Sequence, residues 1–229
     1  MNFILDYIHN DVRNVTIYFL VLLLIDKLFL TKARWYILHF IANFIVCVVT
    51  FNDVINIIVD PLNVQLKEHT AGNVLMALHL YHMIMFKNIQ IVDWVHHIVM
   101  LTILTFTYSF KAGTYVANYN MFFLSGLPGG IDYFMLTLVK YGKMSNLQEK
   151  YINCKLNIWI RGPGIIVGAY LIFLQYMRGL LETPAFIMAF TLIGLIWNAQ
   201  YFTERIISNY YQKLLIKEHM HDVPTLIKE

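Results

Sequence analysis

The segment Val92–Phe110, VDWVHHIVMLTILTFTYSF, decides the fold class, because it is an almost continuous apolar run that holds one aspartate and two adjacent histidines. A run of about 20 apolar residues matches the hydrocarbon thickness of a bilayer when it is helical. Ionisable residues inside such a helix usually face the bundle interior and mark a functional path. The segment therefore predicts a transmembrane helix that contributes to a functional site.

The composition of the whole chain supports a membrane protein. Of its 229 residues, 59% are hydrophobic and only 14% are charged, and the mean hydropathy is +0.58. Soluble domains carry roughly a quarter charged residues. The apolar residues come in long runs, which predicts an all-α, polytopic membrane helical bundle. Two distant cysteines exclude a disulfide framework, and the net charge of +3 indicates no nucleic-acid partner.

The apolar runs predict about seven transmembrane helices, separated by polar linkers with turn residues. The expected spans are 14–31, 35–59, 70–87, 90–112, 114–138, 157–177 and 183–209. A short N-terminal segment (1–13) precedes this membrane domain (14–211), and a polar tail (212–229) follows it. Val15–Leu30 ends without a small-residue cleavage site, so the first span is expected to remain in the protein.

The distribution of lysine and arginine predicts the orientation of the chain. Twelve of these residues fall in the loops after spans one, three and five and at the C-terminal end, whereas four fall on the opposite side. Loops rich in lysine and arginine remain cytosolic. The N-terminus is therefore expected to be lumenal or extracellular and the C-terminus cytosolic, as an odd number of spans requires.

Polar residues from several spans fall at a similar depth in the expected membrane. A helix rises 1.5 Å per residue, so counting inward from the loops places these residues in one layer of the cytosolic half. The layer contains His79, His82, Asp93, His96, His97 and Asp132, with Arg161 at the start of the sixth span. The sequence thus predicts one polar site built from several helices.

The fifth expected span contains helix-breaking residues. The stretch Phe122–Leu136, FFLSGLPGGIDYFML, places serine, proline and three glycines in an apolar run. Broken backbone at membrane depth is tolerated against protein or a water-filled cavity, and such breaks often line binding sites. Either this stretch lines a cavity, or Gly129 and Gly130 form a kink that allows two helices to approach closely.

The spacing of Asp93, His96 and His97 indicates chemistry. These residues stand at i, i+3 and i+4 and share one helix face. A carboxylate can orient a neighbouring imidazole, which then acts as a general base or a nucleophile.

Several polar residues also have structural interpretations. Asp93 could instead cap a helix at the interface, and Asp132 could cap the half-helix after Pro128. Arg161 could extend to the membrane boundary, and His39 is interpreted as a hydrogen-bonded packing residue.

A metal centre is a further alternative, because "HLYH" and "DWVHH" loosely resemble the histidine boxes of membrane di-iron enzymes. Those boxes have HxxxH and HxxHH spacing and come in a larger set. Here HxxH and DxxHH supply four histidines without a third box. The spacing therefore predicts no metal site of that kind.

At VDWVHHIVMLTILTFTYSF the sequence resembles the TLC-domain superfamily, which includes ceramide synthases. Lys111–Gly113 fits the family's small loop and Val139–Met144, VKYGKM, its exit from the next span; the resemblance extends from Ala71 to Met177. The stretches YHMIMFKN, GLPGGIDY and NIWIRGPG are similar to a branch seen in protists and large DNA viruses. The resemblance implies a TLC-like six-helix barrel plus one helix.

By the same resemblance, His96 and His97 correspond to the family's histidine pair and Asp93 to the acid before it. Asp132 corresponds to the second acid of the Asp-x-x-Asp motif of ceramide synthases, whereas the first acid falls on Gly129. The implied function is an acyl-CoA-dependent lipid acyltransferase in the endoplasmic reticulum. His96, His97 and Asp93 would be catalytic. Lining residues of the substrate pocket would be His79, His82, Asp132, Gly129 and Arg161.

The expected co-substrate is acyl-CoA, with no tightly bound cofactor, and the expected partners are membrane lipids and a second copy in a homodimer. Gly129 supports an alternative, a non-enzymatic protein that binds or regulates membrane lipids. A retinal-binding receptor is disfavoured, because the seventh span lacks a lysine for a Schiff base. A transporter is disfavoured, because no repeated half is visible.

Overall fold

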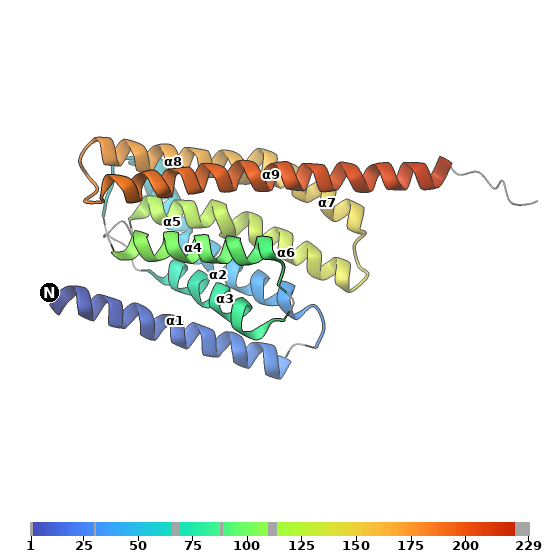
Figure 1. The fold of residues 1–229 in the computed structure, drawn as a ribbon, viewed down its shortest axis with the longest axis horizontal. Helices are drawn as coiled ribbons and strands as arrows, with labels where there is room; N and C mark the ends of the chain where they lie inside the picture. Colours follow the sequence, from blue (N-terminus) through green and yellow to red (C-terminus); the bar gives the residue numbers. More distant parts are fainter. Residues whose placement is uncertain (1, 30, 66–68, 88, 110–113, 223–229) are drawn as a thin grey trace, which may run out of the picture.

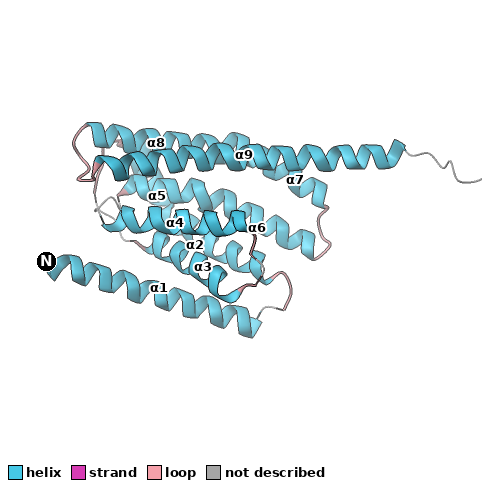
Figure 2. Ribbon diagram, in the orientation of Figure 1, coloured by secondary structure: helices cyan, strands magenta, loops and turns pink. Residues whose placement is uncertain are grey.

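The computed structural model describes residues 2–29, 31–65, 69–87, 89–109 and 114–222, and every element among them is helical (Figures 1 and 2). The predicted all-helical class is confirmed for these residues. The small loop expected at Lys111–Gly113 lies outside the described residues, as does the end of the expected tail, 223–229.

Helices cover most of each expected span, and a further helix forms at Asn146–Leu156, where a polar linker was expected. Several are single helices: α1 (Asn2–Phe29), α2 (Arg34–Val59), α3 (Thr70–Met85), α4 (Ile91–Ser109) and α9 (Ala185–Asp222). The others form two continuous rods, α5 (Tyr115–Met121), η1 (Phe122–Gly126) and α6 (Leu127–Lys140), followed by α7 (Asn146–Leu156), η2 (Asn157–Arg161) and α8 (Gly162–Met177). The helix α1 begins within the expected N-terminal segment, and α9 continues into the expected tail.

Among the described residues, four helices are long and apolar enough to cross a membrane: Arg34–Val59, Tyr115–Lys140, Asn146–Met177 and Ala185–Lys217. The outer face of α2 shows the pattern expected of a lipid-facing surface. Phe44, Val48, Phe51, Ile55 and Ile58 recur at helical spacing, and each is exposed. Contiguous apolar exposure of this kind is rare on soluble monomers. The chain thus has the properties of an integral membrane protein.

The glycine- and proline-containing stretch of the fifth span forms a π-helical segment rather than an open break. The segment η1 joins α5 to α6 without interrupting the rod, and η2 joins α7 to α8 in the same way. Pro128 has no N–H to donate to the carbonyl of Leu124, four residues earlier. Arg161 Nε, at the end of η2, donates to that carbonyl at 3.2 Å. The two π segments are therefore linked to each other.

The helix α2 packs its inner face against α3, α5 and α6. One apolar core lies between α1, α2 and α3, and a second lies mainly between α5, α8 and α9. In Figure 1, α1 and the α8–α9 pair lie on opposite sides of the bundle. The bundle interior between these sides contains the polar residues.

The outer helix α1 is attached through two of its carboxylates. Near its start, Asp11 accepts a hydrogen bond from Asn73 Nδ2 at 2.9 Å, and its other oxygen lies 2.9 Å from His69 Nδ1. Near its end, buried Asp26 pairs with Arg34 and accepts a hydrogen bond from the hydroxyl of Tyr81 at 2.7 Å. Both attachments reach α3 or the residue that precedes it.

Candidate functional site

A polar cavity of about 250 Å³ lies in the bundle interior, and we call it the histidine cavity. It receives side chains from α2, α3, α4, η1, α6, α7, η2 and α9. All eight residues expected to form the site line it: His79, His82, Asp93, His96, His97, Gly129, Asp132 and Arg161. The structure therefore brings together residues that are up to 82 positions apart in the sequence.

The histidines form a compact group of aromatic rings in this cavity. His82 Nδ1 lies 2.6 Å from His97 Nε2, so the two rings form a buried hydrogen bond. His79 Nδ1 donates to the backbone carbonyl of Leu75 at 2.6 Å, which leaves Nε2 as the acceptor nitrogen of that ring. His39 lines the same cavity and lies 3.0 Å from the carbonyl of Trp35 through its Nδ1.

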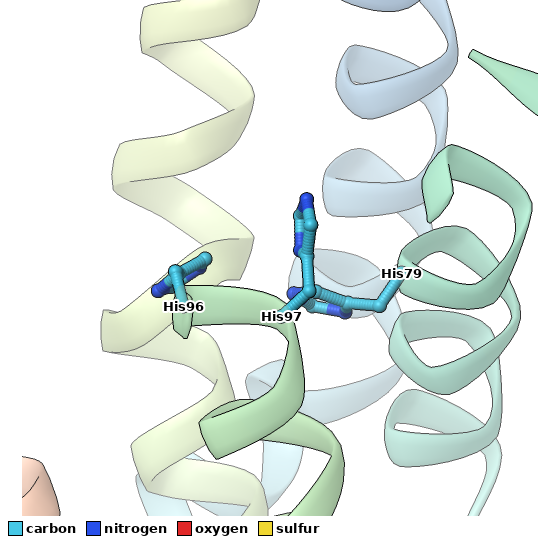
Figure 3. Close-up of side chains that lie close together, drawn as sticks. All are labelled: His79, His96 and His97. Atoms are coloured by element: carbon cyan, nitrogen blue, oxygen red, sulfur yellow. The ribbon is translucent and has the colours of Figure 1, made fainter. Parts of the chain in front are cut away.

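Three of these histidines lie especially close together. His79, His96 and His97 each offer one ring nitrogen, and these nitrogens all lie within 4.8 Å of one another. Figure 3 shows the His79 side chain extending from α3 toward His97, with His96 on the other side of His97. We call these residues the three-histidine cluster. His79 and His97 are buried, and His96 is partly buried.

The contact that orients His97 comes from a neighbouring helix rather than from Asp93. Asp93 lines the histidine cavity, but it forms no hydrogen bond with His96 or His97 among the described residues. Trp35 of α2 packs its indole ring against His39 and His82, which holds the rings of α2 and α3 in place. The imidazole of His97 is thus positioned by His82.

The segment around Gly129 brings α6 close to α2. A Cβ atom at Gly129 would lie 2.6 Å from Nδ2 of Asn43, whereas one at Gly130 would keep ordinary contact distances. The other amide atom of Asn43, Oδ1, accepts a hydrogen bond from Ser125 at 2.6 Å. Gly129 is therefore a position of close helix approach, where a carboxylate side chain would displace the amide of Asn43.

The opposite wall of the cavity contains charged groups. Arg161 Nη2 donates to Asn198 Oδ1 of α9 at 2.5 Å, so its guanidinium links η2 to α9. Asp132 lies close enough to Arg161 and to the fully buried Glu149 of α7 to interact electrostatically with both. Positive and negative groups therefore meet in one part of the cavity.

A second cavity of about 60 Å³ adjoins the first, and we call it the apolar cavity. Leu75, Met100 and Leu124 line both cavities. The remaining lining of the apolar cavity is mostly aliphatic and includes Ile103, Leu104, Val116, Ala117, Ile172, Met188 and Leu195. The histidine cavity thus has an apolar neighbour inside the same bundle.

Sequence reasoning missed several residues of the site. Trp35, Asn43, Tyr133, Asn153, Asn157 and Asn198 line the histidine cavity, but none of them was expected there. One signal was available for part of this set, because Asn153 and Asn157 stand four residues apart and therefore share a helix face. Trp35 and Asn43 of α2 reach the cavity only because of how α2 packs against its neighbours, so no local sequence pattern predicts them.

Comparisons with protein-family models, with curated proteins and with solved structures find no match to this chain.

Proposed function

We propose that this protein is a membrane-embedded lipid-modifying enzyme, an acyl-CoA-dependent acyltransferase of ceramide-synthase type. The observation that carries the proposal is the adjacency of the histidine cavity to the apolar cavity through Leu75, Met100 and Leu124. An acyl group is itself apolar along its chain and polar at its carbonyl carbon. We expect the first carbons of the acyl chain to enter the apolar cavity and the reacting end to lie in the histidine cavity.

The chemistry of the proposal rests on the imidazoles. His96 or His97 acts as the general base that takes a proton from the acceptor amine or hydroxyl as the acceptor attacks the thioester carbonyl. The C–S bond then breaks, and CoA leaves as its thiol. Alternatively, one of these imidazoles is the nucleophile that displaces CoA and then passes the acyl group to the acceptor. His82 holds the His97 ring through its hydrogen bond. Asp93, Asp132 and Arg161 line the same cavity and provide charges around the reacting groups.

The proposed arrangement in the membrane follows the charge bias of the loops. We place the N-terminus in the lumen of the endoplasmic reticulum, the C-terminus in the cytosol and all the long helical rods across the bilayer. The peripheral position of α1 supports a TLC-like barrel with one additional helix. The histidine cavity then lies toward the cytosolic side, where the soluble part of acyl-CoA can reach it.

The proposal is tested with purified full-length protein in liposomes that contain radiolabelled acyl-CoA and a mixture of amine- and hydroxyl-bearing lipids. We expect a labelled acylated lipid from the wild type and none from a His96→Ala, His97→Ala double variant. His69→Ala is the matched control, since His69 is a buried histidine outside the cavity. Equal transfer by the double variant and the wild type would contradict the proposal.

A second candidate is a lipid-binding protein without turnover. Gly129 favours it, because the position of the first acid in the ceramide-synthase motif is filled by close contact with Asn43. Lipid that co-purifies with the protein, together with no acyl transfer to any acceptor, would select this candidate over the enzyme.

A further inference from the structure

We propose that His79, His96 and His97 bind one Zn²⁺ ion in the bundle interior. The inference does not rest on the proposed acyl transfer, because it is argued from the nitrogen atoms of the cluster. The spacing of the histidines in the sequence disfavours only a di-iron site with many histidines. A catalytic zinc site can be built from three imidazoles with a fourth coordination position left open.

The nitrogen atoms are close enough for this purpose. They lie within 4.8 Å of one another, whereas the nitrogens of a tetrahedral zinc site with bonds of about 2.1 Å lie roughly 3.4 Å apart. Small rotations of the side chains about their χ angles would close this difference. No hydrogen bond holds the His96 ring among the described residues, and its neighbours are other rings, such as Phe202.

The hydrogen bonds around the cluster leave metal-binding nitrogens available. His79 donates a hydrogen bond from Nδ1 to the carbonyl of Leu75, which leaves the lone pair of Nε2 available to bind a metal. Ligand histidines typically have such a second hydrogen bond, which fixes the tautomer and the ring orientation. His82 has the same role for His97, because it occupies Nε2 of that ring.

An unpartnered buried atom supplies independent support. His97 is 4% exposed, and its Nδ1 is buried without a hydrogen-bond partner. A buried polar atom without a partner carries a desolvation penalty that native proteins usually avoid. Since Nε2 faces His82, Nδ1 is the nitrogen left to bind a metal, and a Zn²⁺ ion would satisfy it.

The surroundings suit a dication with an open coordination position. Asp93 and Asp132 line the same cavity and can balance its positive charge. The open position would face the histidine cavity, where an oxygen atom of a lipid substrate could reach it. In the zinc-bound protein these imidazoles are ligands, and the ion itself would polarise an acyl carbonyl. Because the imidazoles have different roles in the two proposals, the metal content and the acyl-transfer rate are measured in separate experiments.

The test uses full-length protein purified in mild detergent, stripped with a chelator and reloaded with Zn²⁺ or Co²⁺. We expect one ion per chain by mass spectrometry of the metal, and the visible absorption of tetrahedral Co²⁺. His79→Gln and His96→Gln should lose the ion and the absorption while eluting as folded protein. His39→Gln and His69→Gln, at buried histidines outside the cluster, should keep both.

Binding should also stabilise the wild type, so its thermal midpoint should rise on reloading, whereas the midpoints of the two cluster variants should not change. The proposal is overturned if reloaded wild type holds no stoichiometric metal, or if the ion persists in both cluster variants. It is equally overturned if the His39 and His69 variants lose the ion as fully as the cluster variants do. Absence of acyl transfer in a zinc-loaded protein would contradict only the proposed function.

Discussion

His82 of α3 and His97 of α4 form a hydrogen bond of 2.6 Å between Nδ1 of the first ring and Nε2 of the second. Both side chains are buried, and the indole ring of Trp35 packs against His82. The bond joins the two helices that supply the three-histidine cluster. It also sets which nitrogen of His97 faces the cavity.

Removing the His82 side chain should therefore leave the His97 imidazole without its orienting hydrogen bond. We expect His82→Ala to lower acyl transfer by about 10²- to 10³-fold, in the range of a lost general base. A His82→Ala, His97→Ala double variant should be no slower than His97→Ala alone, since residues that act as a unit are not additive. Rates measured in liposomes test this, with His69→Ala as the control. Additive losses would show that the two histidines act separately.

Filling the apolar cavity should change the choice of acyl chain. Ala117 lines this cavity and is almost fully buried. Ala117→Leu adds about three carbon atoms to a small space, so overpacking should disfavour long chains. We expect transfer from long-chain acyl-CoA to fall relative to transfer from short-chain acyl-CoA in a competition assay. An unchanged ratio would exclude this cavity as the acyl site.

Neighbouring glycines of α6 should differ in their tolerance of alanine. A Cβ at Gly129 would lie 2.6 Å from Asn43 Nδ2, whereas at Gly130 the nearest contact would be 3.8 Å. Gly129→Ala should lower the free energy of unfolding by about 1–3 kcal/mol through overpacking. Gly130→Ala should be neutral or stabilising, because alanine favours the helix. Thermal unfolding in detergent measures both, and equal midpoints would contradict the close approach.

The guanidinium of Arg161 should matter for stability because it joins η1, η2 and α9. Arg161→Met removes the donors to the Leu124 carbonyl and to Asn198. Leaving these buried acceptors unpaired should cost about 2–4 kcal/mol. Arg178→Met is the matched control, since Arg178 is exposed at the end of α8. Similar thermal midpoints for the two variants would show that the linkage contributes little.

The attachment of α1 should depend on Tyr81. Its hydroxyl donates to Asp26 at 2.7 Å, and both side chains are buried. Tyr81→Phe leaves Asp26 with one donor fewer and should destabilise the protein by about 1–3 kcal/mol. Tyr170→Phe, at an exposed position on α8, should have little effect. Limited proteolysis near the end of α1 should also quicken in the Tyr81 variant alone.

Much of the helical framework could be predicted from the sequence. The expected spans fall on helices because apolar runs and polar linkers are local properties of the chain. Counting residues inward from the loops predicts one layer that contains His79, His82, Asp93, His96, His97 and Asp132. In the structure these residues line one cavity. Rise per residue is a constant of the α-helix, so depth requires no knowledge of packing.

Which groups meet within that layer was decided by the tertiary structure. The i, i+3 and i+4 spacing associated Asp93 with the histidines, yet His97 bonds to His82 across two helices. The contact of Gly129 with Asn43, the bond from Arg161 to Leu124 and the shared wall of the two cavities also join distant parts of the sequence. Local spacing determines the face and depth of a side chain on its own helix. The rotation of each helix against its neighbours depends on how all the side chains pack together.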